Sequence, residues 1–423
     1  MLPKAGPKFL SEATPTEIAA ACRQRDGLVF FDSALESLGA LSIVAADPVQ
    51  ILRGHLDRDG DRLREILEAR RTPLGADAGV PEGMLAGWVD YDGAFCFGEY
   101  ESAFVHRHAD QSWQTVGRPA RWIEAQEFAQ PDASDLTTTP LAFQPEQTPA
   151  DYCRMVAIAQ ERIAAGDIYQ VNLAHRFSTS WPGSDAFAFY ESLRHYSPAP
   201  FAAYLHVGGR QVLSASPESF LRMSGRGIRT RPIKGTRPRR AEAIADERSA
   251  FDLITSAKEI AELVMITDLE RSDLGQVCEY GSVEVRELMH IERYEHVFHL
   301  VSTVAGTLRP EVDHVTALQR CFPGGSITGA PKKRAREIIA ELETIPRGLY
   351  TGAIGWFGFN GESQFNIAIR TVVVEGDRAH FHVGAGIVAD SQPEREWQET
   401  LDKAAGILLA AERHGTRTED GQR

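Results

Sequence analysis

The sequence predicts an α+β protein built mainly from antiparallel sheet, because it contains two hairpin signals alongside helical runs. One hairpin turn is Gly208-Gly209 and the other is Asn360-Gly361. Such dipeptides suit the tight turns that join antiparallel strands, and each lies between runs of alternating apolar residues. The flanking runs are 201–207 with 211–216, and 353–359 with 365–374. A doubly wound parallel sheet is therefore not expected.

The other elements follow from periodicity and composition. A helix is expected at about 150–165, and a last strand after the turn at 375–377. Nearer the N-terminus the strand-like runs are 28–31, 42–46 and 84–91, with a helical run at 61–70. Residues 128–150 are rich in Pro, Thr and Asp and lack periodicity, which indicates a linker or a long surface connection. We therefore divide the chain into regions 1–145 and 146–415, which can also be two parts of one intertwined fold.

Composition narrows the class of function. The 423 residues carry 45 Lys and Arg against 59 Asp and Glu, a net charge of −14. This balance argues against partners such as nucleic acid or a membrane surface, so an anionic small substrate would need locally placed cations. There is no apolar run long enough to span a membrane and no secretory signal. The five cysteines are far apart and form no CxxC motif, so a cytoplasmic location is expected.

Three short motifs resemble known functional motifs, but the surrounding sequence does not support those functions. Residues 384–389, GAGIVA, match a dinucleotide fingerprint, but only one helix follows where a complete βαβ unit is needed. Residues 324–329, GGSITG, lack the lysine of a P-loop, although a Gly-rich turn that enters a helix with Pro331 in its first turn can bind an anion. His296 and His299 could supply half of the ligands of a metal site, but ordinary structural histidines are the favoured alternative because no second cluster at metal spacing is present.

Lys234 is the first candidate catalytic residue. It stands in RPIKGT at the end of a strand-like run, sixteen residues after Glu218. A lysine at such a junction can be partly desolvated, which lowers its pKa and frees an amine nucleophile, and a nearby carboxylate can move its proton. A surface salt bridge is the alternative.

Carboxylates recur at helical spacing in two predicted helices. Glu259 and Glu262 share one face of the first helix, and Glu396 and Glu399 share one face of the second. Two helices could thus present oxygens to one Mg²⁺, which prefers one or two carboxylates plus water and substrate oxygens. Ordinary i, i+4 ion pairs with nearby lysines are the alternative.

Arg370 is placed by alternation at the end of the strand FNIAIR, on the face shared by Asn366 and Ala368. A cation there would suit a substrate carboxylate, and a solvated strand charge is the alternative.

Taken together, the ordered motifs GDIYQVNLAHRF, SPESF, RPIKGT, AKEIAELVMITDLERSDLG, FPGGSITGAPKKRA, YTGAIGWFGF and GAGIVADSQPEREWQETLDK resemble the chorismate-utilising enzymes. The resemblance covers nearly the whole chain. It is looser in region 1–145, and there the chain is similar to the N-terminal part of anthranilate synthase component I. It implies two large antiparallel sheets in a sandwich, flanked by helices, with chorismate between them.

The resemblance also implies roles for individual residues. Lys234 would be the nucleophile, Glu218 the general acid, and His299 would lie beside the ring. Glu262 and Glu399 would hold Mg²⁺, with Glu396 as a water-mediated helper. The implied substrate contacts are Gly235, Thr236, Ser326, Tyr350, Arg370, Gly384, Gly386 and Lys403.

Two positions separate the members of this superfamily. Isochorismate and salicylate synthases carry a lysine base where this chain has Gln170, and anthranilate synthases carry alanine where it has Lys234. The resemblance thus implies synthesis of 4-amino-4-deoxychorismate for p-aminobenzoate and folate, with ammonia from a separate glutamine amidotransferase subunit. Anthranilate synthase component I is the enzymatic alternative, and a non-catalytic chorismate- or tryptophan-binding protein is the alternative from another class.

Overall fold

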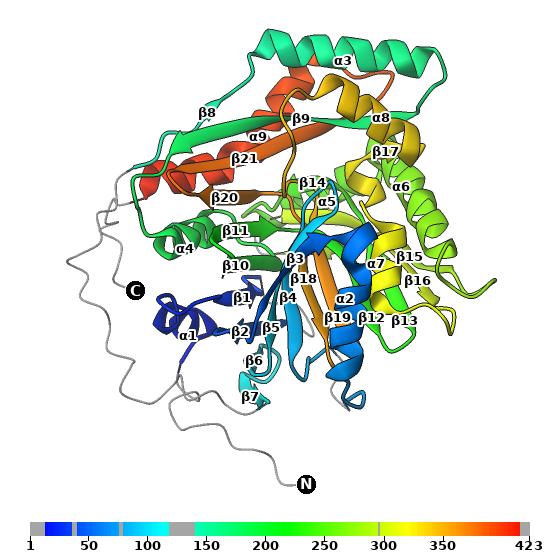
Figure 1. The fold of residues 1–423 in the computed structure, drawn as a ribbon. Helices are drawn as coiled ribbons and strands as arrows, with labels where there is room; N and C mark the ends of the chain where they lie inside the picture. The colour runs from blue at the N-terminus through cyan, green and yellow to red at the C-terminus, as the bar shows by residue number, and fades with distance from the viewer. Residues whose placement is uncertain (1–12, 36–39, 76–78, 118–139, 295–296, 415–423) are drawn as a thin grey trace.

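The computed structural model describes residues 13–35, 40–75, 79–117, 140–294 and 297–414. Their strands form two large sheets in which every strand pairing is antiparallel (Figure 1). The predicted α+β class and its two-sheet architecture are confirmed. Each described helix is too short or too polar to traverse a lipid bilayer.

The first sheet contains both strands of the Gly208-Gly209 hairpin and both strands around the turn at 375–377. Its order is β17 (Gly329–Ala330), β9 (Gln170–Ser180), β21 (Arg378–Ile387), β20 (Thr371–Glu375), β11 (Arg210–Ser216), β10 (Phe201–Val207), β1 (Val29–Asp32), β2 (Leu41–Ala45), β6 (Ala103–Arg107) and β7 (Ser112–Val116), with β8 (Gln144–Pro145) paired to β9. The fingerprint-like glycines 384 and 386 lie inside β21, between antiparallel neighbours, so a dinucleotide-binding βαβ unit is excluded there.

The second sheet contains the Asn360-Gly361 hairpin. Its order is β14 (Ile233–Pro238), β16 (Val297–Thr307), β13 (Gly227–Arg231), β12 (Ser219–Ser224), β19 (Glu362–Ile367), β18 (Ala353–Gly358), β4 (Met84–Val89), β5 (Ala94–Tyr100) and β3 (Ile51–His55), with β15 (Glu284–Arg293) on β16. Strands from both sides of residue 145 are hydrogen-bonded together in each sheet, for example β10 to β1 and β18 to β4.

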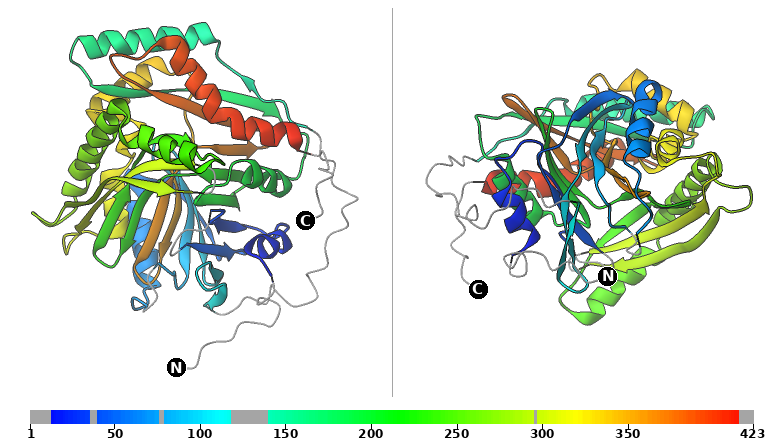
Figure 2. Two further views of the ribbon diagram at one scale, coloured as in Figure 1. Left: turned by 180° about the vertical axis from the view of Figure 1, so that it is seen from behind. Right: turned by 60° about the horizontal axis from the view of Figure 1, so that its bottom comes forward.

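Helices cover the outer faces of the two sheets. They are α1 (Pro15–Ala21), α2 (Leu56–Ala69), α3 (Pro149–Ala164), α4 (Ala186–Tyr196), α5 (Ala243–Ile254), α6 (Ala257–Gly275), α7 (His314–Cys321), α8 (Lys332–Leu342) and α9 (Pro393–Arg413). In Figure 1, α2 and α7 lie against the second sheet, and α3, α8 and α9 gather at the β9–β21 end of the first. Viewed from behind, α5 lies in front of the second sheet and close to α6 (Figure 2).

The core between the sheets is built from the inner faces of both. Val29, Leu205 and Val212 of the first sheet pack with Trp88 and Trp356 of the second, and all five are buried. Alternation of apolar side chains along each strand places such residues on the facing surfaces.

Of the short segments that carry the chain from one sheet to the other, two contain predicted site residues. The first joins β11 to β12 and contains Glu218, and the second joins β19 to β20 and contains Arg370. The first is bonded to the residue just before the second, since the Ile367 amide at the end of β19 donates to Glu218 O at 3.0 Å. We call them the crossovers.

The second crossover corrects the sequence prediction for FNIAIRTVVV. The sequence predicts strand throughout this run, with Arg370 at the end of its part FNIAIR, but β19 ends at Ile367 and β20 begins at Thr371 in the other sheet. Arg370 has a φ of 49°, a left-handed conformation, so alternation does not place its side chain. Likewise, β17 separates the Gly-rich turn from α8, and Pro331 is the residue before that helix rather than part of its first turn.

Of the predicted linker 128–150, residues 128–139 lie outside the described part of the chain. The remainder contains β8 and the first residues of α3, whose N-terminus is capped by the Thr148 hydroxyl.

Candidate active site

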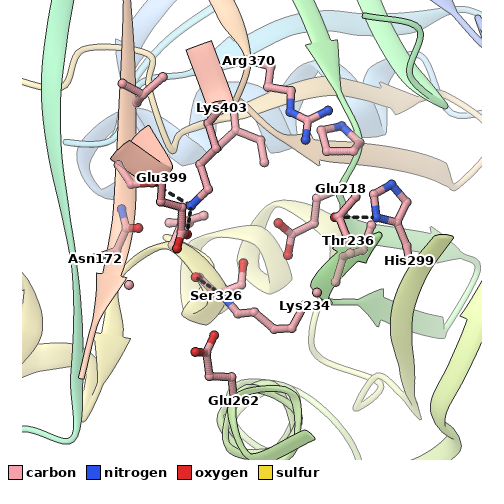
Figure 3. Close-up of a pocket in the computed structure, with 18 of the residues that line it drawn as sticks. Asn172, Glu218, Lys234, Thr236, Glu262, His299, Ser326, Arg370, Glu399 and Lys403 are labelled. Atoms are coloured by element: carbon pink, nitrogen blue, oxygen red, sulfur yellow. Dashed lines mark hydrogen bonds and ion pairs between the residues drawn. The ribbon is translucent and has the colours of Figure 1, made fainter. Parts of the chain in front are cut away.

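A cavity of about 570 Å³ lies where the crossovers meet strands β14 and β21, helices α6 and α9, and the short 3₁₀ helix η2 (Gly325–Ile327). Nearly all of the predicted site residues line it (Figure 3). They are Glu218, Lys234, Gly235, Thr236, Glu262, His299, Ser326, Tyr350, Arg370, Gly384, Gly386, Glu399 and Lys403. Glu396 is buried and is not among the lining residues, so the expected helper role has no support in this geometry. His296, the other half of the possible metal pair, lies outside the described residues.

Lys234 reaches into the cavity from an irregular strand. The pairing of β14 with β16 shifts register between Lys234 and Thr236, and Gly235 between them has a φ of 68°. A β-carbon at Gly235 would lie 2.6 Å from Leu253 Cδ1, so both conformation and space require glycine. Irregularities of this kind re-aim side chains beside active sites. The Lys234 ammonium is part-buried and donates to Ser326 O at 3.2 Å.

Glu218 faces the same space from the first crossover (Figure 3). Only 6% of the residue is exposed, and burial raises the pKa of its carboxyl to about 6, against the opposing effect of the Lys234 charge and a hydrogen bond from Ser326. A carboxyl with this pKa holds its proton closer to neutral pH than an ordinary glutamate, as a general acid must. Its burial also excludes the surface salt bridge considered for this pair.

Glu262 of α6 and Glu399 of α9 lie on different helices that border the cavity. Burial raises the pKa of Glu262, and the charges of Glu259 and Glu399 add to the effect. Glu399 is also partly buried, but its ion pair with Lys403 at 2.8 Å lowers its pKa overall. Both i, i+4 pairs considered from the sequence are present, because Lys258 lies 3.8 Å from Glu262.

These two carboxylates are a chemically suitable pair for Mg²⁺. They are hard oxygen donors whose mutual repulsion a cation would relieve, and Mg²⁺ usually keeps several waters or substrate oxygens beside one or two carboxylates. Within the described ranges, no three His, Cys, Asp or Glu side chains are grouped closely enough to enclose a metal by themselves. The residues therefore fit a shared protein–substrate site and not an all-protein cage.

His299 and Arg370 form another wall. His299 Nδ1 lies 3.0 Å from the Thr236 hydroxyl, and burial together with the Arg370 charge lowers the His299 pKa to about 4. The imidazole is therefore neutral near pH 7 and can donate or accept one hydrogen bond at each nitrogen, depending on tautomer. Arg370, by contrast, remains a cation and can attract a carboxylate.

The far wall comes from the first sheet and α9. Lys403 donates to Gly384 O at 2.9 Å, which places its ammonium beside β21. The Tyr350 ring stacks on His382 at 5.4 Å, and burial raises the pKa of the phenol to about 12, so it stays a neutral donor. Cations and neutral donors thus line the cavity together with the two carboxylates, of which Glu399 is paired with Lys403 on the same helix.

Several lining residues were not predicted from the sequence, among them the polar residues Asn172, Arg237, His382 and Asp402. Asn172 is two positions after Gln170, and its side chain faces the Tyr350 hydroxyl, whose pKa it lowers. Its place in the alternating strand QVNLA could have indicated it. Gln170 itself packs against Gly386, since a β-carbon there would lie 2.3 Å from Gln170 Nε2.

Comparisons with known proteins agree with this geometry. A family model described as chorismate binding enzyme matches residues 69–409. Aminodeoxychorismate synthase component 1 of Bacillus subtilis (strain 168) is 47% identical over 261 residues, covering 62% of this chain and 55% of the relative. The chain thus spans about half the length of that relative.

Two further matches extend over most of the chain. Anthranilate synthase component 1 of Methanothermobacter marburgensis is 36% identical over 420 residues, 91% of this chain and 89% of the relative. The structure of anthranilate synthase component I from Streptococcus pneumoniae superposes with a TM-score of 0.76 at 32% identity, covering 88% of this chain and 93% of that one. With the fold and the cavity, these matches show that the chain belongs to the chorismate binding enzyme family.

Proposed function

We propose that this chain converts chorismate and ammonia into 4-amino-4-deoxychorismate, as an aminodeoxychorismate synthase component I. The observation that carries the proposal is the placement of Lys234, part-buried in the cavity that Glu218 also lines. Anthranilate synthases, which the chain also resembles, generally have alanine at this position, and alanine offers no nucleophile.

In the proposed reaction, the neutral Lys234 amine attacks C2 of chorismate. The ring double bonds shift, the C4–O bond breaks, and Glu218 donates its proton so that the hydroxyl leaves as water. The lone pair of ammonia then attacks C4, the double bonds shift back, and the C2–N bond to Lys234 breaks. Two inversions give net retention at C4, the lysine returns to its starting state, and the new ammonium on C4 returns a proton to Glu218.

The remaining residues bind and orient the substrate. Arg370 and Lys403 are suited to its two carboxylates, while Thr236, Ser326 and Tyr350 supply neutral hydrogen-bonding groups. Glu262 and Glu399 would hold Mg²⁺, which when bound supplies a positive charge that steadies and orients the ring carboxylate.

Product analysis tests the proposal directly. The purified chain is incubated with chorismate, ammonium and Mg²⁺, and the products are separated by liquid chromatography with mass detection. The expected product keeps the enolpyruvyl group and releases no pyruvate. Anthranilate with stoichiometric pyruvate would identify an anthranilate synthase instead, and absence of turnover would favour the non-catalytic alternative.

The nitrogen source gives a separate prediction. A glutaminase needs a reactive thiolate, but all five cysteines are described, and burial raises the thiol pKa of Cys96, Cys153, Cys278 and Cys321. Cys22 is also buried. We therefore expect turnover of chorismate with ammonium salts, rising with pH as free ammonia increases, and none with glutamine alone.

Adding a cognate glutamine amidotransferase subunit should confer glutamine use, measured as glutamate released per chorismate consumed. Glutamine-dependent turnover by the chain alone would contradict this prediction, and a Cys153→Ala variant would then locate or exclude the most accessible thiol.

A further inference from the structure

The Gly325–Ser326 turn is fastened to helix α6 by one buried carboxylate. The Gly325 amide donates to Glu270 Oε1 at 3.0 Å, and the Ser326 amide also donates to this carboxylate. The Thr230 hydroxyl donates to Glu270 Oε2 at 3.3 Å. Only 3% of Glu270 is exposed, and it does not line the cavity.

The same turn contacts Lys234 and Glu218, the proposed nucleophile and general acid. Ser326 O accepts a hydrogen bond from the Lys234 ammonium at 3.2 Å, and the Ser326 hydroxyl donates one to the Glu218 carboxylate. A shift of the turn would therefore move the hydrogen-bond partners of nucleophile and acid together. Arg347 holds the other end of the turn, where it donates to Ile327 O at 3.2 Å.

Burial raises the pKa of Glu270, and the positive charge of Lys332 on α8 opposes this rise. In its described hydrogen bonds Glu270 only accepts, which favours the ionised carboxylate. Lys332 donates to Asp273 Oδ2 at 2.5 Å, so this lysine serves two buried carboxylates on α6. An ionised carboxylate with satisfied lone pairs can persist in such a site because its charge is compensated.

We propose that Glu270 is a positioning residue, which acts through the Gly325–Ser326 turn to align Lys234 and Glu218. This inference rests on the proposed function for the roles of those two residues. In addition to the contacts, the negative charge of Glu270 raises the pKa of Glu218. The charged groups that face Glu218 are Lys234 from β14, which lowers its pKa, and Glu270 from α6.

A Glu270→Gln variant tests the proposal, since it keeps the shape of the side chain and removes its charge. The amide cannot accept from every donor, so the turn loses at least one bond, and we expect kcat to fall about 10-fold or more with little change in KM. Loss of the like charge should also lower the Glu218 pKa by about half a unit or more. Infrared difference titration of the unliganded enzyme measures this shift, with Glu218→Gln identifying the carboxyl band.

Asp273→Asn is the matched control. It removes another buried α6 carboxylate that pairs with Lys332, but Asp273 makes none of the described contacts to the Gly325–Ser326 turn. It should lower the melting temperature as Glu270→Gln does, while kcat and the Glu218 titration stay close to those of the wild type. If Glu270→Gln misfolds, Thr230→Val, which removes one donor to Glu270, should give a smaller fall in kcat.

Two results would overturn the inference. One is a folded Glu270→Gln variant with the kcat and Glu218 titration of the wild type, and the other is equal effects of both α6 variants on kcat and titration. If the wild type makes a product other than aminodeoxychorismate, the proposed function fails, but the infrared titration still decides whether Glu270 controls Glu218.

Discussion

Replacing Lys234 by alanine is expected to lower kcat/KM for amination at C4 by at least about 10³-fold, because the variant has no nucleophile for the first displacement. The fold should survive, since Lys234 borders the cavity and its main bond is to a backbone oxygen. Intact-mass spectrometry of wild-type protein quenched during turnover should reveal a chorismate-derived adduct, and peptide mapping should place it on Lys234.

Lys234→Arg is the control for charge. It keeps a cation in the cavity, but a guanidinium is protonated at any usable pH and cannot attack C2. We expect it to be as inactive as the alanine variant. The alanine variant can retain a slow direct attack of ammonia at C2, which would give an anthranilate-type product. An active alanine variant that still makes aminodeoxychorismate, together with an unmodified lysine in the wild type, would refute the covalent mechanism.

The second large effect concerns the two carboxylates on different helices. Glu262→Gln or Glu399→Gln should raise the Mg²⁺ concentration for half-maximal activity by more than about 10-fold, because each removes a charged oxygen donor. Calorimetric titration of Mg²⁺ in the presence of chorismate measures the same loss without turnover.

Glu259→Gln is the control on the same helix face. Glu259 also lines the cavity, but it lies 3.4 Å from Arg237 and is already paired with that cation. Its substitution should change the Mg²⁺ requirement little. Equal and mild effects at all three glutamates would favour the ion-pair interpretation of these helices over a metal site.

The features predicted correctly from the sequence are those that neighbouring residues determine. Gly208-Gly209 and Asn360-Gly361 specify their hairpins because turn geometry depends on two adjacent dihedral pairs. Similarly, helix α3 and the N-terminal strands predicted at 28–31, 42–46 and 84–91 follow from local periodicity, and their observed bounds differ from the expected ones by a few residues, whereas β3, β5, β6 and β7 were not predicted.

Local sequence patterns could not predict that the chain passes from one sheet to the other between β19 and β20. The run from Phe365 to Val374 contains no glycine or proline, so nothing in it indicates that the chain leaves one sheet at Ile367 and enters the other at Thr371. The placement of Arg370 failed for that reason. Glu270 was missed because its partner Gly325 is 55 residues away, a separation that helical spacing cannot detect.

The crossovers have a mechanical consequence. Glu218 and Arg370 are each joined by a few covalent bonds to both sheets, so any sliding of one sheet past the other displaces them directly. Close-packed cores transmit strain, and small misplacements of reacting groups slow a reaction steeply. Side chains such as Val212 and Trp356, which fill the space between the sheets, therefore set the alignment of a site that they do not touch. Selection for turnover would then restrict this interior more tightly than selection for folding alone.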